Sequence, residues 1–266
     1  MNPINDIAIV LPAFNEEQDL PKLLARIEET LSNQPFRYQV IVVDDGSKDR
    51  TADIAREASL RMPVRLIQHP QNRGLGMAMQ TGLHAAATSA DAVITMDSDN
   101  THDPINVPAM INLIRSGTAQ VVIASRYQKG SVIQGVPFYR QILSLGCFVL
   151  MKTVVPFKNV RDYSAGFRAY DASILQRMIL AYGQDKLVEE SGFVCMLEIL
   201  LKLRAIGATA AEIPYTLRYD LKAGASKLRI FRTLRRYLAV VNRYRAKLPT
   251  PSLPNSLSPT TQATKA

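Results

Sequence analysis

The stretch Met96-Asp97-Ser98-Asp99-Asn100 directly follows the apolar run Ala92-Val93-Ile94-Thr95. A short apolar run of this kind is typical of a buried strand. Two carboxylates one residue apart at the end of such a strand can hold a divalent cation against a diphosphate, because hard cations prefer oxygen ligands and keep positions for substrate phosphates. Asp and Asn also favour ordinary turns, so the stretch alone leaves both interpretations open.

Comparable apolar runs lie on both sides of this stretch, at residues 7–11, 40–43, 64–67 and 120–124. Continuous β-branched runs indicate strands covered on both faces, and therefore a mostly parallel sheet. Segments with helical spacing alternate with them, at residues 16–31, 50–61, 76–87 and 103–115. Asn15 is the expected N-cap of the first helix, and Pro12 is expected to stop the first strand. We predict an α/β doubly wound domain, whose ligands gather at the carboxyl ends of the strands.

The second half of the chain is less regular. We expect a loop at 130–137, an apolar helix at 138–155, a mixed segment at 162–170, a short helix at 172–180, an amphipathic helix at 193–206 and a strand at 208–214. Residues 228–248 predict a basic amphipathic helix with Phe231, Leu234, Leu238 and Val241 on its apolar stripe. We therefore divide the chain into a domain at 1–228, this helix at 229–248 and a Pro-, Ser- and Thr-rich tail at 249–266 that is expected to be disordered.

Composition places the chain among ordinary folded proteins, with 47% hydrophobic and 21% charged residues in 266. The net charge of +9 is concentrated in residues 222–247, which hold nine Lys and Arg and no acidic residue. Such a block suggests an anionic partner: nucleic acid, lipid head groups or a phosphorylated substrate. The two cysteines, Cys147 and Cys195, lie among apolar residues and are expected to be reduced in a cytoplasmic protein. We expect no signal peptide and no transmembrane helix.

Polar signatures follow four of the predicted strands. They are Pro12-Ala13-Phe14-Asn15-Glu16, Asp44-Asp45-Gly46-Ser47, Asp97-Ser98-Asp99 and Ser125-Arg126-Tyr127. In a doubly wound sheet these ends converge on one edge. Asp44 can accept a hydrogen bond from a base N–H or a ribose hydroxyl, the acidic pair can hold a metal, and Arg126 can meet phosphate charge. Each signature taken singly is also explained by turn chemistry or capping.

Together with Asn72-Arg73-Gly74, these motifs resemble family 2 inverting glycosyltransferases of the GT-A fold. Motifs in the second half are similar to those of dolichol- or polyprenyl-phosphate mannosyltransferases and their bacterial relatives: Phe138-Tyr139-Arg140, the run from Asp162 to Arg168, Glu212-Ile213-Pro214 and the run from Gly224 to Leu228. The resemblance covers residues 7–228. It implies a Rossmann-like, mostly parallel sheet followed by C-terminal amphipathic interface helices.

The resemblance also implies roles for individual residues. The base and ribose would be held by Pro12, Phe14, Glu16, Val42 and Asp44. Asp97 and Ser98 would bind the sugar nucleotide, Asp97 and Asp99 would hold Mg²⁺ or Mn²⁺, and Arg126 would bind the phosphate region. The acceptor phosphate and the departing nucleotide would be handled by Arg140, Ser164, Arg218 and Lys227. Asp97, Asp99, Arg126 and Arg140 would form the catalytic set.

Two departures from the family pattern qualify these roles. Thr101 stands where family members often place a Gln that binds the metal, and the spacing from Arg218 to Gly224 is longer than in the compact Arg-x-x-Gly-x-Ser-Lys motif. The first leaves the choice of metal open. The second makes the role of Arg218 less secure and favours a bacterial variant with its own donor.

Chemistry favours a phosphate as the acceptor. An inverting transfer to a hydroxyl needs a general base, whereas a lipid monophosphate is already an anionic nucleophile. The second half supplies cations near its motifs, namely Arg140, Arg168, Arg218 and Lys227. Asp162 and Glu190 remain possible bases, so a hydroxyl acceptor stays open.

The leading hypothesis is therefore a metal-dependent transfer of a mannose- or glucose-type hexose from GDP-mannose or a UDP-hexose to a dolichyl or undecaprenyl phosphate. Glycosyl transfer to a lipid or sugar hydroxyl is the alternative. A basic nucleic-acid-binding module is a third interpretation, which rests on the charge block alone and which the acidic strand ends disfavour. Tyr237 and Tyr244 in the basic helix match an interfacial helix on anionic lipid, so we expect a peripheral protein at the inner face of the membrane.

Overall fold

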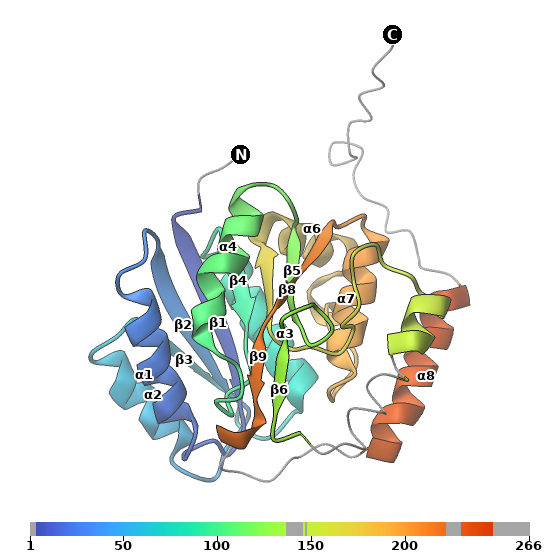
Figure 1. Cartoon of the computed structure of the whole chain (residues 1–266). Helices are drawn as coiled ribbons and strands as arrows, with labels where there is room; N and C mark the ends of the chain where they lie inside the picture. Colours follow the sequence, from blue (N-terminus) through green and yellow to red (C-terminus); the bar gives the residue numbers. More distant parts are fainter. Residues whose placement is uncertain (1–3, 137–145, 147, 222–229, 247–266) are drawn as a thin grey trace.

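The computed structural model describes residues 4–136, 146, 148–221 and 230–246, and a seven-stranded sheet with helices on both faces forms its centre (Figure 1). The strand order is β3-β2-β1-β4-β7-β5-β8. The strands are β1 (Asp6–Ala13), β2 (Arg37–Asp44), β3 (Val64–Gln68), β4 (Ala92–Thr95), β5 (Val121–Ser125), β7 (Arg168–Asp171) and β8 (Ala210–Pro214). The predicted α/β, mostly parallel sheet is confirmed.

The four strands of the first half that carry polar signatures point the same way. β1 pairs in parallel with β2 and with β4, and β5 pairs in parallel with β8. All residues of β4 and β5 are buried, because helices cover both faces, which explains their continuous apolar runs. The first strand extends beyond Pro12 to Ala13. Pro12 lies past the last pair between β1 and β4, Val10 with Thr95, so its missing N–H leaves that pairing intact.

β7 is the strand of the main sheet that the sequence did not predict. It lies between β4 and β5 and runs antiparallel to both, with Arg168 opposite Thr95 and Ile123. The mixed segment expected at 162–170 therefore ends in a strand, which begins at Arg168. A buried arginine is atypical of a strand interior, and this masked the strand pattern.

Helices divide between the two faces of the sheet. Buried side chains of α1 (Leu20–Leu31), α2 (Thr51–Ser59) and α4 (Val107–Arg115) share one core cluster, and those of α3 (Leu75–Ala87), α6 (Ala172–Tyr182), α7 (Cys195–Ala205) and α8 (Ile230–Ala246) share the other. The described part of the chain also contains three short 3₁₀ turns: η1 (Pro104–Asn106), η2 (Gln184–Lys186) and η3 (Tyr219–Leu221). Both cores are apolar, and each packs against one side of the same strands.

A small second sheet lies beside the main one. β6 (Val132–Gln134) pairs in parallel with β9 (Thr216–Arg218). The predicted loop at 130–137 thus contains a strand. Its partner is more than 80 residues away in the sequence, so local pattern gave no indication of the pairing.

The first helix begins later than predicted. Its N-cap residue is Asp19, and residues 17–19 form a turn that leads into it. Asn15, the expected N-cap, adopts a positive φ of 52°. Its backbone N–H donates to Ser47 Oγ at 2.9 Å, and its side-chain oxygen accepts from the Lys48 N–H at 2.9 Å. Asn15 therefore joins two loops instead of capping a helix.

Two late helices also differ from their predicted faces. α7 is buried along nearly its whole length, including Glu198 and Lys202, whose charges form an ion pair at 2.7 Å. Among the α8 side chains that the structure describes, Tyr237, Val240, Val241 and Tyr244 are buried, whereas Leu238 is exposed. The prediction of an amphipathic α7 was wrong, and the predicted apolar stripe of α8 was wrong at Leu238 and right at Val241.

Some predictions fall outside the described residues, namely residues 138–145 and 147 of the apolar helix, Cys147, and the tail at 249–266. Residues 148–154 of that segment are helical as expected. Cys195 is a free, fully buried thiol, and burial raises its pKa. In the part of the chain that is described, every helix is too short or too polar to cross a bilayer.

Gly82 tests the packing of α3 on the sheet. A Cβ at this position would stand 2.2 Å from Val10 Cγ1. Alanine would gain about 1 kcal/mol in helix propensity, but overpacking a core typically costs about 1–3 kcal/mol, and here the clash is severe. We expect Gly82→Ala to lower the free energy of unfolding by roughly 1–2 kcal/mol in urea denaturation. Gly192→Ala, whose Cβ would meet no atom within 4 Å, is the control; equal stability of the two variants would contradict this packing.

Candidate functional site

The carboxyl ends of β1, β2, β4 and β5 share one edge of the sheet. Ala13 lies opposite Asp44, and the β4 pairing brings the chain after Thr95 beside the end of β1. Two contacts tie these ends together: Ser98 Oγ donates to the Pro12 carbonyl at 2.8 Å, and the Asp45 N–H donates to the Ala13 carbonyl at 2.8 Å. The predicted convergence of the first three signatures is confirmed by these contacts.

The acidic loop after β4 is held by its own residues. Thr101 Oγ1 donates to Asp99 Oδ1 at 2.6 Å, and Asn100 adopts a positive φ of 60°. His102 Nδ1 accepts from the Asp97 N–H at 3.0 Å, and its ring stacks on Phe167. Asp97 and Asp99 are half-buried, while the residues that shape the loop are buried. The two carboxylates are therefore carried on a fixed loop.

Gly166 leaves space beside Asp97. A Cβ at position 166 would stand 3.0 Å from Asp97 Oδ1. Any larger residue would press on this carboxylate, so the glycine makes room for it at the start of β7. The structure thus connects the acidic loop with a motif seventy residues later.

Asp44 and Asp45 have different surroundings at the end of β2. Asp44 is fully buried and accepts from the Ser47 N–H and from Gln68 Nε2, both at 3.0 Å. Asp45 accepts from the Arg73 and Gly74 N–H groups at 2.9 and 2.7 Å and contacts His69 Nδ1 at 2.7 Å. Asp45 therefore organises the loop before α3, and Asp44 lies beside it at the end of the strand.

Arg126 forms a buried ion pair with Asp162 at the end of β5. Its Nε and Nη2 donate to the two Asp162 oxygens at 2.8 and 2.6 Å, and Nη2 also donates to Ser164 Oγ. Burial alone would raise the pKa of the Asp162 carboxyl, but Arg126 outweighs burial and lowers this pKa. Burial would lower the pKa of Arg126, and Asp162 outweighs it in the same way and raises that pKa. Asp162 is thus a poor proton acceptor.

Tyr215 is the residue of this site that sequence reasoning missed. It is buried, and nearby charges change the pKa of its phenol: Arg126 lowers it, whereas Asp162, Asp97 and Asp99 raise it. Burial is the main reason that its pKa is raised. Its ring makes edge contacts with the rings of His102 and Phe167, with centroids 6.1 Å apart in both pairs, so it packs between the acidic loop and the segment that enters β7. The only local signal was its position directly after the Glu212-Ile213-Pro214 motif.

Two of the predicted residues, Val42 and Arg168, are fully buried. Val42 is fully buried in the core that contains α1 and α4, so its side chain does not reach the edge. Arg168 is fully buried and donates to the Met196 and Tyr163 carbonyls at 2.7 and 3.0 Å, so it is not an accessible cation for an acceptor. Its side chain instead ties the start of β7 to α7.

The remaining predicted residues lie at the end of β1, on β9 or outside the described part of the chain. Pro12, Phe14 and Glu16 are half-buried at the end of β1, and the Glu16 N–H donates to Thr51 Oγ1 at 2.8 Å. Arg218 pairs with Asp220 at 3.0 Å, and its backbone N–H donates to the Thr101 carbonyl at 3.0 Å, which ties β9 to the acidic loop. Arg140 and Lys227 lie outside the described residues.

The acidic loop suits a hard cation that keeps other ligands. Within the described residues, no three His, Cys, Asp or Glu side chains gather closely enough to hold a metal by themselves. Asp97 and Asp99 offer carboxylate oxygens, which Mg²⁺ and Mn²⁺ prefer, and the missing Cβ of Gly166 leaves room beside them. Such a cation would need further oxygens from a ligand, as it does where it bridges a protein and a diphosphate.

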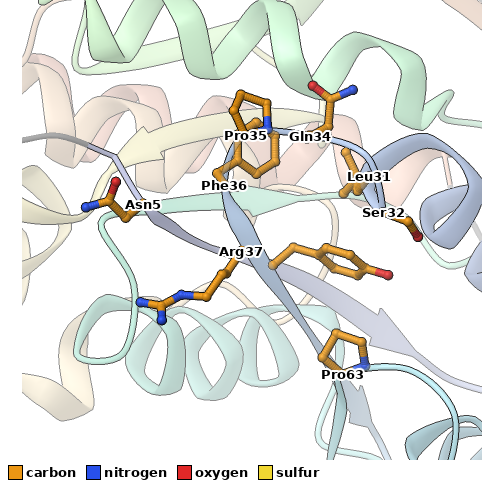
Figure 2. Close-up of a pocket in the computed structure, with 9 residues that line it drawn as sticks. Asn5, Leu31, Ser32, Gln34, Pro35, Phe36, Arg37 and Pro63 are labelled. Carbon is orange, nitrogen blue, oxygen red and sulfur yellow. The ribbon is translucent and has the colours of Figure 1, made fainter.

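A surface pocket lies at the opposite edge, where β2 begins (Figure 2). It is lined by residues of the segment 31–38 together with Asn5 and Pro63. Arg37, the first residue of β2, belongs to it, so it faces away from the carboxyl ends. None of the predicted site residues lines this pocket.

The chain is similar in sequence to several known mannosyltransferases. The chain is 32% identical over 234 residues to a dolichol-phosphate mannosyltransferase of Pyrococcus furiosus, covering 86% of this chain and 62% of that protein. It is 26% identical over 231 residues to a polyprenol monophosphomannose synthase of Mycolicibacterium smegmatis, covering 86% and 83%. An undecaprenyl-phosphate mannosyltransferase of Micrococcus luteus is 27% identical over 224 residues, covering 84% and 87%. The chain thus spans less than two thirds of the first of these relatives.

Solved structures share the fold. Glucosyl-3-phosphoglycerate synthase of Mycobacterium tuberculosis, crystallised with Mn²⁺ and UDP-glucose, superposes with a TM-score of 0.67 at 21% identity, covering 92% of this chain and 80% of that one. The same enzyme with Mg²⁺ and UDP gives a TM-score of 0.64. The GT-A architecture expected from the sequence is therefore confirmed. The sequence profile of glycosyl transferase family 2 matches residues 8–179, about two thirds of the chain, and the protein belongs to that family.

Proposed function

We propose that this protein transfers a hexose of the mannose or glucose type from a nucleotide sugar to a polyprenyl phosphate, with inversion at the anomeric carbon. The observation that carries the proposal is the convergence of Asp44, the Asp97–Asp99 loop and the Arg126–Asp162 ion pair at one edge of the sheet. Two of the three relatives above are named as mannosyltransferases of dolichol phosphate and of undecaprenyl phosphate, and the third is named for the synthesis of polyprenol monophosphomannose.

The donor would lie across the ends of β1, β2 and β4. Asp44 would accept from the base or ribose, in the company of Pro12, Phe14 and Glu16, and Asp97 and Ser98 would face the diphosphate. The Asp44 carboxylate is already organised by the Ser47 N–H and by Gln68, so its orientation is set before a donor binds. Both GDP-mannose and a UDP-hexose remain candidates.

A divalent cation would be held by Asp99, with Asp97 beside it. When bound, it would neutralise charge on the diphosphate and so help the nucleotide to leave. Thr101, in place of the family Gln, donates to Asp99 Oδ1. Its hydroxyl thus orients the carboxylate without adding a ligand of the amide type.

The acceptor phosphate would approach from the side of Arg126 and Ser164, with Arg140 and Lys227 as further cations. Arg126 remains partly accessible, with 20% of its side-chain surface exposed, although Asp162 fixes its orientation. A phosphate acceptor needs no general base. Of the two acids considered as bases, Asp162 is held by Arg126, and Glu190 contacts Arg236 at 3.0 Å. Both pairings disfavour a hydroxyl acceptor.

Peripheral membrane binding would use the outward side of α8, which we define as residues 238, 239, 242 and 243. All four are exposed, among them Leu238 and Arg243. An exposed leucine and an exposed cation on the same helix suit the interface of an anionic bilayer. Tyr237 and Tyr244 do not contribute, because both are buried against the protein.

The acceptor class can be tested directly. The protein is incubated with radiolabelled GDP-mannose or UDP-glucose, a short polyprenyl phosphate and Mn²⁺, and the product is treated with mild acid. We expect a lipid product that mild acid hydrolyses, because a glycosyl phosphodiester is labile, and we expect EDTA to prevent its formation. An acid-stable glycoside formed equally well with the free polyprenol would favour the hydroxyl acceptor and contradict the proposal.

Asp99→Asn tests the metal site. The variant keeps the size of the side chain but loses its charge. We expect Mn²⁺-dependent transfer to fall at least about a hundredfold, because a catalytic metal contributes several kcal/mol and each 1.4 kcal/mol is tenfold in rate. Asp185→Asn, the same change at an exposed position, is the matched control. Full Mn²⁺-dependent activity of Asp99→Asn would refute the role of this residue.

Arg243→Ala tests the outward side of α8. One basic residue near an anionic bilayer contributes about 1 kcal/mol, so binding to vesicles that contain phosphatidylglycerol should weaken roughly fivefold. Sedimentation with sucrose-loaded vesicles measures this. Arg61→Ala removes the same charge from an exposed site far from α8 in the sequence and should have little effect. Equal losses in both variants, or tighter binding to duplex DNA at matched salt, would count against a membrane-facing α8.

A further inference from the structure

The turn before α3 rests on a segment that belongs to the second half of the chain. A Cβ at Gly76 would stand 1.8 Å from the Glu190 carbonyl oxygen, and one at Gly74 would stand 2.6 Å from the Ser191 carbonyl oxygen. The Gly76 N–H also donates to the Ser191 carbonyl at 3.2 Å. The backbone of residues 74–76 is therefore in direct contact with the backbone of residues 190–191.

Buried charged residues of α7 hold the segment 189–191 in place. Glu198 on α7 is fully buried and accepts from the Glu189 and Glu190 N–H groups at 2.9 and 2.8 Å. Its charge is balanced by Lys202 at 2.7 Å, which is also buried. These contacts fix the backbone of the segment where it meets residues 74–76.

Arg236 on α8 supplies the remaining support. Its Nε lies 3.0 Å from Glu190 Oε2, and its Nη1 donates to Ser191 Oγ at 2.8 Å. The Glu190 side chain is only 8% exposed. Removing Arg236 would leave a buried carboxylate without this ion pair, which is unfavourable unless the segment moves toward solvent.

On its other side, the turn before α3 meets the end of β2. The Arg73 and Gly74 N–H groups both donate to Asp45, whose neighbour Asp44 is the residue that we assign to the base or ribose. A continuous series of contacts therefore runs from Arg236 through residues 190–191 and 74–76 to Asp45. Figure 1 shows α8 at one side of the molecule, away from α1 and α2, so the series joins distant parts of the fold.

We propose that Arg236 is a positioning residue for the donor nucleotide: by holding Glu190 and Ser191 it fixes the turn 73–76, and it thereby couples the docking of α8 to the affinity for the donor. The identity of the ligand rests on the proposed function, whereas the coupling within the protein does not. Because coupling between two equilibria is reciprocal, bound nucleotide would also hold α8 more firmly against the protein.

Amide hydrogen exchange tests the coupling without any ligand. We expect Arg236→Ala to accelerate exchange at residues 73–76, where local opening becomes easier, while β1 and β2 keep their protection. Glu190→Gln, which keeps the shape of the side chain, should change the same amides in the same direction. Arg235→Ala removes an adjacent, exposed cation from the same helix and should match the wild type. Unchanged exchange at 73–76 in both Arg236→Ala and Glu190→Gln would overturn the proposal.

Calorimetric titration with GDP or UDP in the presence of Mn²⁺ tests the consequence for the donor. We expect Arg236→Ala to weaken nucleotide binding roughly fivefold or more, at the lower end of typical coupling between sites, with Arg236→Lys intermediate and Arg235→Ala unchanged. Wild-type affinity in Arg236→Ala would overturn the coupling to the donor. Failure of the wild type itself to bind either nucleotide would contradict the proposed function, and the exchange experiment would still decide the coupling.

Discussion

The antiparallel insertion of β7 between β4 and β5 is the constraint on which the site depends. Because β7 runs against its neighbours, the chain that enters it, residues 162–167, lies where β4 and β5 end. This brings Asp162 to Arg126 and Gly166 to Asp97. A parallel strand in the same place would carry these residues to the opposite edge of the sheet, so the strand direction joins a motif of the second half to the acidic loop of the first.

Buried charge then makes this arrangement rigid. Asp162 with Arg126 and Glu198 with Lys202 are ion pairs in which at least one partner is fully buried, and Arg168 is satisfied by two carbonyls. Such groups tolerate little movement, because a displaced partner leaves a charge uncompensated in a medium of low polarity. The Arg126–Asp162 pair and Arg168 border the carboxyl edge directly. The Glu198–Lys202 pair supports the segment 189–191, which contacts the turn at 74–76. The protein therefore presents a preformed edge at which only ligands and mobile side chains need to adjust.

Sequence alone predicted the part of the fold that local pattern controls. The parallel strands have continuous apolar runs, and their acidic ends fall where strands stop, so Asp44, Asp97 and Asp99 could be assigned to one edge. β7 could not be predicted, because Arg168 breaks the apolar pattern and its partners are distant. On α8 the predicted stripe was wrong at Leu238, because Tyr237 and Leu238 are adjacent and local pattern does not show which of them packs inward. The structure buries Tyr237 and Tyr244, and Tyr244 lies 3.5 Å from Glu198. Val42 was placed at the site by resemblance, although its position inside β2 buries it.

The central claim is that the edge of the sheet binds a nucleotide diphosphate and a divalent cation together. The most direct measurement is a crystal structure of the protein grown with Mn²⁺ and GDP or UDP, with anomalous diffraction collected at the manganese edge. The account predicts one strong anomalous peak within coordination distance of the Asp99 carboxylate, bridged to the diphosphate, with the base near Asp44. A nucleotide bound with its manganese away from Asp97 and Asp99, or seated in the pocket beside Arg37, would contradict it.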